Sequence, residues 1–200
     1  PTFTKRELDA RGVGDQLRVW SLVERGAFWS MGLVVVAELS LAPPRIMATL
    51  LMMAALFQVI RLLGWSPHRC LRQPLVWVLH GAYLFLAAGL ALRALALWSD
   101  LLPQATALHM LTIGAFGMAL AGIMTRVSLA HTGRPPIPGR IFVSVYLLLA
   151  LAALLRVGLA EALPLWANRL SGVLWLVCFT LILLRLVPIL TQARVDGRPG

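Results

Sequence analysis

The stretch from His109 to Arg134 reads HMLTIGAFGMALAGIMTRVSLAHTGR and decides the fold. It is long enough for a helix that crosses a bilayer, which needs about 20 apolar residues. It also carries His109, Arg126 and His131, and ionisable side chains are costly inside a membrane unless they bind or pair with something. The stretch therefore predicts a transmembrane helix and is the first place to look for a functional site.

The whole chain has the composition of a membrane protein. Hydrophobic residues make up 60% of its 200 residues and the mean hydropathy is +0.83. Lipid solvates such surface, provided that the backbone bonds to itself, as it does in helices. The short alternating strands that a transmembrane barrel requires are missing from the sequence. We therefore expect an all-α, polytopic transmembrane helical bundle.

Six apolar runs of about the required length follow one another along the chain. They cover residues 20–41, 45–63, 75–98, 105–130, 141–162 and 166–187. The first run is the weakest, because Glu24, Arg25 and Glu38 interrupt it. The expected organisation is a cytoplasmic amino-terminal segment over 1–19, a six-helix transmembrane domain over 20–190 and a cytoplasmic tail over 191–200.

The formal net charge of +10 predicts membrane orientation and no nucleic-acid partner, because the arginines are dispersed between apolar runs. Basic residues gather in the amino-terminal segment, in the tail, and in the loops that contain Arg72 and Arg134. These four parts lie on one side of a six-span protein. Both termini are therefore expected in the cytoplasm.

Two histidines are candidate ligands inside the expected spans. His80 lies about 9 Å along its helix from Pro74, at a rise of 1.5 Å per residue. It is either an imidazole ligand to iron or copper or a histidine bonded to a neighbouring carbonyl. If the third and fourth spans form an antiparallel hairpin, His80 and His109 differ in height by about 20 Å. They would then not share one metal atom.

The same hairpin brings Arg93 to the level of His109 and Arg126 to the level of His80. Each arginine can pair with a buried anion, of which a haem propionate is one candidate, or extend to the nearest interface. A stripe of small residues follows the fourth span at Gly114, Gly117, Ala121 and Gly122, with Thr125 and Ser128 beyond. Helix packing explains this stripe better than a cofactor face does.

Other chemistry has little support in the sequence. Cys70 and Cys178 stand far apart and have no metal-binding spacing. Met110, Met118 and Met124 are soft donors that suit Cu(I), but methionine is also an ordinary packing residue. No Ser/His/Asp set, phosphate loop or carboxylate pair points to hydrolysis or nucleotide chemistry.

The string ALHMLTIGAFGMALAGIMTRVSLAHTGR, from Ala107 to Arg134, resembles a pattern of the NnrS family. NnrS proteins are multi-pass membrane proteins of bacteria linked to haem, copper and the response to nitric oxide. The likeness extends to PLVWVLHGAYLFLAAGLALRAL, from Pro74 to Leu95, and to VPILTQARVDGRPG at the carboxyl end. Family members usually have about twice as many residues, so the chain resembles their carboxyl-terminal half, and the missing amino-terminal half or another copy of the chain is an implied partner.

The resemblance implies a protein of the bacterial inner membrane with haem b and copper as cofactors and nitric oxide as a small-molecule partner. It implies a role in relief of nitrosative stress, with a haem- or copper-dependent redox activity as one form of that role. By the resemblance, His80, His109 and His131 are the expected haem or copper ligands. Arg93, Arg126 and Arg134 are the expected supporting positive groups.

Two other functions remain open. In a transporter or channel, Arg93, Arg126 and Arg156 would line an anion path and the histidines would relay protons. In an assembly or sensor subunit without chemistry of its own, the small-residue stripe would dock a partner helix.

Overall fold

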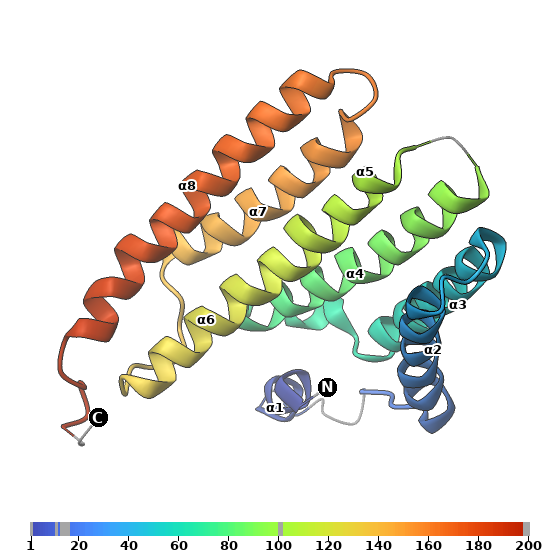
Figure 1. Ribbon diagram of the computed structural model, residues 1–200. Helices are drawn as coiled ribbons and strands as arrows, with labels where there is room; N and C mark the ends of the chain where they lie inside the picture. Colours follow the sequence, from blue (N-terminus) through green and yellow to red (C-terminus); the bar gives the residue numbers. More distant parts are fainter. Residues whose placement is uncertain (1, 11, 13–16, 100–101, 198–200) are drawn as a thin grey trace.

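The computed structural model describes residues 2–10, 12, 17–99 and 102–197, so the segments 1–19 and 191–200 are described in part. Its long elements are helices, which have the following bounds. They are α2 (Ser21–Leu39), α3 (Pro44–Gly64), α4 (Pro74–Trp98), the continuous run of α5 (Gln104–His109), η3 (Met110–Phe116) and α6 (Gly117–His131), then α7 (Arg140–Gly158) and α8 (Pro164–Thr191) (Figure 1). The described part contains no strand, which confirms the all-α prediction.

Each of the six predicted runs corresponds to one of these helical segments. Among the described residues, five of the segments are long and apolar enough to cross a membrane. The exception is α2, whose Glu24, Arg25 and Glu38 had already marked it as the weakest run. The protein is therefore a multi-pass helical membrane protein.

Proline and glycine set several helix ends. Pro44, Pro74 and Pro164 each occupy the first turn of a helix, where the missing N–H is not needed. After α6, Gly133 adopts a φ of +70°, which a helix-ending glycine takes without steric cost. The last helix extends beyond the predicted run 166–187: α8 continues to Thr191, with Pro188 inside it.

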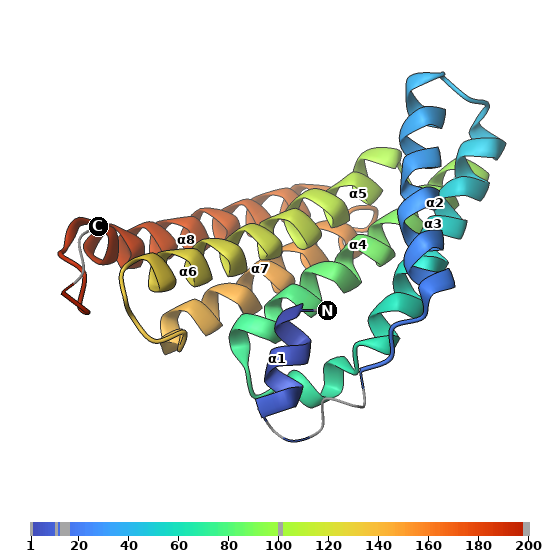
Figure 2. The same ribbon diagram turned by 90° about the horizontal axis from the view of Figure 1, so that it is seen from below.

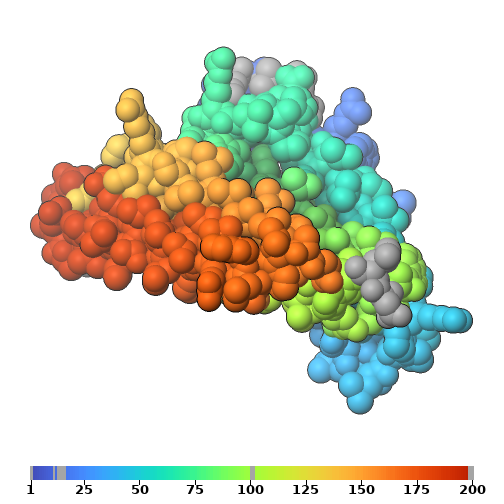
Figure 3. Space-filling model, turned by 90° about the horizontal axis from the view of Figure 1, so that it is seen from above, coloured from blue at the N-terminus to red at the C-terminus, as the bar shows by residue number. Residues whose placement is uncertain are grey.

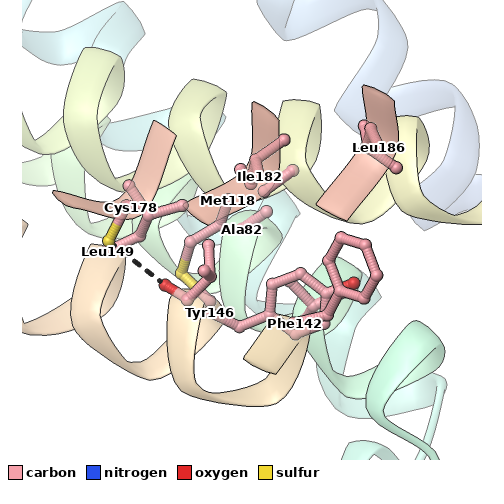
Figure 4. Close-up of a cluster of buried hydrophobic side chains, with 11 residues drawn as sticks. Ala82, Met118, Phe142, Tyr146, Leu149, Cys178, Ile182 and Leu186 are labelled. Atoms are coloured by element: carbon pink, nitrogen blue, oxygen red, sulfur yellow. Dashed lines mark hydrogen bonds between the residues drawn. The ribbon is translucent and has the colours of Figure 1, made fainter. Parts of the chain in front are cut away.

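The helices pack in sequence order, and α4 is central (Figures 1 and 2). Its amino-terminal half contributes Val78 and Ala82 to a buried cluster with α6, α7 and α8, part of which is drawn in Figure 4. Its carboxyl-terminal half contributes Leu90 and Ala94 to a second cluster with α2 and α3. In Figure 3, α8 lies along the outer surface of the molecule, away from the α2–α3 hairpin.

The small-residue stripe is a packing surface, as expected. A Cβ atom added to Gly114 would lie 2.7 Å from the Phe85 ring, and one added to Gly122 would lie 2.7 Å from Val78. Both neighbours belong to α4, so α4 and the η3–α6 run form the predicted antiparallel hairpin. The glycines let the two helices approach closely.

Two short elements among the described residues were not predicted. Residues 2–10 form the short helix α1 (Thr2–Ala10), which contacts η2 (Pro67–Cys70), the turn of 3₁₀-helix before α4. Leu8 of α1 is buried against Cys70 and Val76. Figures 1 and 2 show α1 below the bundle, near the end where α4 begins.

Candidate functional site

A cavity of about 470 Å³ lies between α1, the end of α3, α4 and the η3–α6 run. We call it the His80 cavity. Its polar lining consists of Thr4, Trp65, His80 and Tyr83. The other lining side chains are apolar: Phe3, Val76, Leu79, Ala82, Leu86, Leu111, Ala115, Phe116 and Ala119. Such a volume, with apolar walls and few polar groups, is typical of sites for small molecules and cofactors.

His80 is the one histidine in this lining, and it is only 6% exposed. Its Nε2 is 2.9 Å from the Thr4 hydroxyl, whereas its Nδ1 is buried without a hydrogen-bond partner among the described residues. In the structure His80 therefore bonds a hydroxyl group, and not a neighbouring carbonyl. Trp65, whose ring centroid is 6.1 Å from that of His80, has a buried Nε1 that also lacks a partner. Buried polar atoms without partners are rare, and each calls for an explanation.

A basic cavity of about 420 Å³ adjoins the His80 cavity, and Phe3 and Val76 line both. Arg6 and Arg126 contribute its positive charges, with Glu7 also in the lining. The Arg126 guanidinium lies 4.0 Å from the centroid of the Phe3 ring and donates to the carbonyl of Leu75 at 2.8 Å. Phe3 and Val76 thus lie between the apolar His80 cavity and this positive region.

The wall formed by η3 has an unusual backbone. Met110–Phe116 is a π-helix of seven residues, a rare conformation that often occurs at functional sites. It contributes Leu111, Ala115 and Phe116 to the His80 cavity. No pattern in the sequence distinguished these residues from an ordinary α-helix.

His109 lies outside the His80 cavity, just before the π-helix. Its Nε2 is 2.8 Å from Nη2 of Arg156 on α7. Because a guanidinium can only donate, Nε2 accepts this hydrogen bond, and His109 is neutral with its proton on Nδ1. A metal at Nε2 would have to displace Arg156.

The remaining predicted site residues do not join the His80 cavity. Arg93 pairs with Glu38 of α2, at 2.6 Å from Nη2 to Oε2. Arg134 donates to the carbonyl of Ile189 and to the side chain of Gln192. His131 is exposed at the end of α6.

The carboxyl-terminal tail folds back against this end of α6. Arg194 donates to the backbone carbonyl of His131 at 2.8 Å and to both carboxylate oxygens of Asp196. The hydrogen bonds to Asp196 raise the pKa of Arg194. Because Arg194 contacts the backbone carbonyl of His131, the His131 imidazole takes no part in this contact.

Sequence reasoning missed a polar cluster on α2, α3 and α4. Arg61 pairs with both carboxylate oxygens of Glu24, at 2.8 and 2.6 Å, and donates to the Tyr83 hydroxyl at 2.9 Å. Tyr83 in turn donates to Gln58. The sequence did contain a signal for this pair. Glu24 lies near the start of one apolar run and Arg61 near the end of the next, so an antiparallel hairpin brings them to the same level.

The fold and the His80 cavity define a class: a multi-pass helical membrane protein with a ligand-sized cavity around a buried histidine. A family model described as NnrS protein matches residues 1–194. The chain belongs to the NnrS family. No curated protein and no solved structure matches it.

Proposed function

We propose that this NnrS protein binds haem b in the His80 cavity and acts in the response to nitric oxide, where it relieves nitrosative stress. The observation that carries the proposal is a buried histidine in the lining of an apolar cavity of about 470 Å³, one of whose ring nitrogens has no hydrogen-bond partner among the described residues. The family's link to haem and nitric oxide supports the same conclusion.

The residues present fit a haem. A haem is a flat apolar ring with two carboxylates at one edge, and it needs at least one axial ligand such as histidine. Ala82, Ala115 and Ala119 leave room against the cavity wall, and His80 is the candidate ligand. Arg126 is the candidate partner for a propionate, because it lies directly beyond Phe3.

A bound haem supplies an iron that binds nitric oxide and exchanges one electron. The chain's own residues would hold it and control access to it. His80 would fix the ring in the cavity, Arg126 would neutralise a carboxylate, and the apolar side chains of η3 and α6 would exclude water. Excluding water strengthens the electrostatic interactions inside such a site.

Copper has less support from these residues. The described part of the chain contains no group of three or more His, Cys, Asp or Glu side chains placed to hold a metal ion. His80 and His109 have separate partners, Thr4 and Arg156. Copper therefore stays a prediction of the family resemblance, and we derive no role from it.

For the location we propose the bacterial inner membrane with both termini in the cytoplasm. The basic loops and segments predicted for the cytoplasm include Arg72 and Arg134. The Val195 N–H donates to the carbonyl of Thr132 at the end of α6. This contact supports the prediction that the tail and the loop after α6 lie on the same side of the membrane. A second copy of the chain, or a further part of the protein, is the proposed macromolecular partner.

The test is an absorption spectrum with haem extraction on the purified protein and on two variants. We expect a Soret band in the wild type that shifts on addition of nitric oxide. His80→Ala should reduce the haem content to background, because it removes the ligand. His109→Ala is the matched control and should retain haem, because His109 lies outside the cavity. A wild type without haem, or a His80→Ala variant with full haem content, would overturn the proposal.

A further inference from the structure

A second large cavity lies on the other side of Tyr83, between α2, α3 and α4. It has a volume of about 480 Å³, and its polar lining is the cluster of Glu24, Gln58, Arg61 and Tyr83. We call it the Arg61 cavity. Tyr83 and Leu86 line both this cavity and the His80 cavity, so they form a common wall. The proposed haem site makes no use of the polar cluster.

The charges of the Arg61 cavity cancel. Arg61 binds Glu24 through two parallel hydrogen bonds, at 2.8 Å from Nε to Oε1 and 2.6 Å from Nη2 to Oε2. An anionic ligand would have to face the Glu24 carboxylate, and a cationic one the guanidinium. The cavity therefore suits a neutral molecule.

The cluster still has hydrogen-bonding capacity in both directions. A guanidinium carries five N–H groups and a carboxylate accepts about four hydrogen bonds. Arg61 donates three hydrogen bonds, two to Glu24 and one to Tyr83. Glu24 accepts the two from Arg61, so donors and acceptors both remain. A matching ligand can therefore accept hydrogen bonds from Arg61 and donate hydrogen bonds to Glu24.

The rim of the Arg61 cavity on α2 is apolar and exposed, as expected for a surface in contact with lipid. Phe28 and Val35 belong to its lining and are 70% and 54% exposed on the outer surface of α2. Glu24 lies in the first turn of α2 and Arg61 in the last turn of α3, near the depth where headgroups meet hydrocarbon. An occupant would enter from the membrane, with an apolar tail left in the lipid.

We propose that the Arg61 cavity binds the headgroup of an isoprenoid quinone or quinol. The ring of such a molecule is flat and neutral, and its apolar tail dissolves in lipid. Its two oxygens accept hydrogen bonds as carbonyls and donate them as hydroxyls. The residual donors on Arg61 match the carbonyl form, and the residual acceptors on Glu24 match the hydroxyl form. The site stands on these residues and does not depend on haem in the neighbouring cavity.

The experiment is calorimetric titration of decylubiquinone into the full chain in lipid nanodiscs. We expect saturable binding at one site. Gly32→Leu should weaken binding at least tenfold, because Gly32 lines the cavity and a Cβ atom there meets nothing within 4 Å. The matched control is Gly172→Leu on α8, where an added Cβ atom is equally free of contacts.

A second pair of variants tests the polar groups. The double variant Glu24→Gln/Arg61→Gln should also weaken binding about tenfold or more, because it removes the charged groups that would hydrogen-bond the ligand. The control is Glu38→Gln/Arg93→Gln, which removes the ion pair between α2 and α4 and leaves the cavity lining unchanged. Equal binding by Gly32→Leu and Gly172→Leu would overturn the proposal. Equally strong competition by a ringless decyl alcohol would do so too, because the cavity would then hold lipid tails.

Discussion

At the scale of single residues, the Glu24–Arg61 pair places two charges on helices that are otherwise mainly apolar. The two side chains are 26% and 28% exposed, for Arg61 and Glu24 respectively. Removing one member of a buried pair leaves an uncompensated charge, whereas removing both is often nearly neutral. The pair is therefore more sensitive to a single substitution than to a double one.

We predict that Arg61→Gln lowers the free energy of unfolding by about 2 kcal/mol more than Glu24→Gln/Arg61→Gln does, because the single variant strands the Glu24 carboxylate. Reversible unfolding in detergent measures the difference. The comparison pair is Arg93–Glu38, in which Glu38 is 50% exposed, so the single and double variants should differ less there. Equal stabilities for the two Arg61 variants would contradict the prediction.

At the scale of helices, the contact between α4 and the η3–α6 run depends on glycine. Gly114→Ala would bring a Cβ atom to 2.7 Å from the Phe85 ring, well inside normal contact distance. Overpacking of this kind costs about 1–3 kcal/mol. The effect should appear as a lower melting temperature in detergent.

Gly172→Ala is the control for Gly114→Ala, since its added methyl group meets no atom within 4 Å. In a helix interior, alanine is favoured over glycine by about 0.5–1 kcal/mol, so this variant should melt at the same temperature or higher. A Gly114→Ala variant as stable as Gly172→Ala would show that Phe85 moves aside without cost.

The helix boundaries could be predicted because they depend on local sequence. The predicted run 75–98 is α4 (Pro74–Trp98) to within one residue, and 45–63 is α3 (Pro44–Gly64). Lipid requires an apolar run of fixed length, and proline limits where a helix can begin. The helix past Pro188 is the exception, because a proline near a helix end removes only one hydrogen bond.

The candidate site could be predicted only in part. His80 stood out as an ionisable residue in an apolar run, but Trp65 had the features of an interfacial aromatic. Its approach to His80 and Tyr83 depends on how α3 packs against α4. The contact of Thr4 with His80 joins residues 76 positions apart, and no periodicity in the sequence reports such a pairing.

At the scale of the whole molecule, the six helical segments place the described parts of both terminal segments at one end of the bundle (Figure 1). The distribution of arginines predicts that this end faces the cytoplasm. Single cysteines test the orientation, because the native Cys70 and Cys178 are both buried and give little background.

We predict that Arg72→Cys, in the loop before α4, reacts with a membrane-impermeant maleimide only after spheroplasts are lysed. Leu163→Cys, in the turn before α8, should react in intact spheroplasts, because one more crossing separates it from the end of α6. Both native residues are exposed, so a difference in labelling between the two variants would not come from burial of one position. Labelling of Arg72→Cys in intact spheroplasts would reverse the orientation.

The common wall of Tyr83 and Leu86 has a thermodynamic consequence. A side chain that borders two cavities cannot shift toward one without enlarging the other, and both residues belong to the single helix α4. We therefore predict that occupancy of the two cavities is linked. If a ligand on the α2 side changes the affinity of the His80 cavity by some factor, a ligand in the His80 cavity must change the affinity of the other by the same factor. With both proposed ligands bound, the affinity of each cavity would then depend on the occupancy of the other.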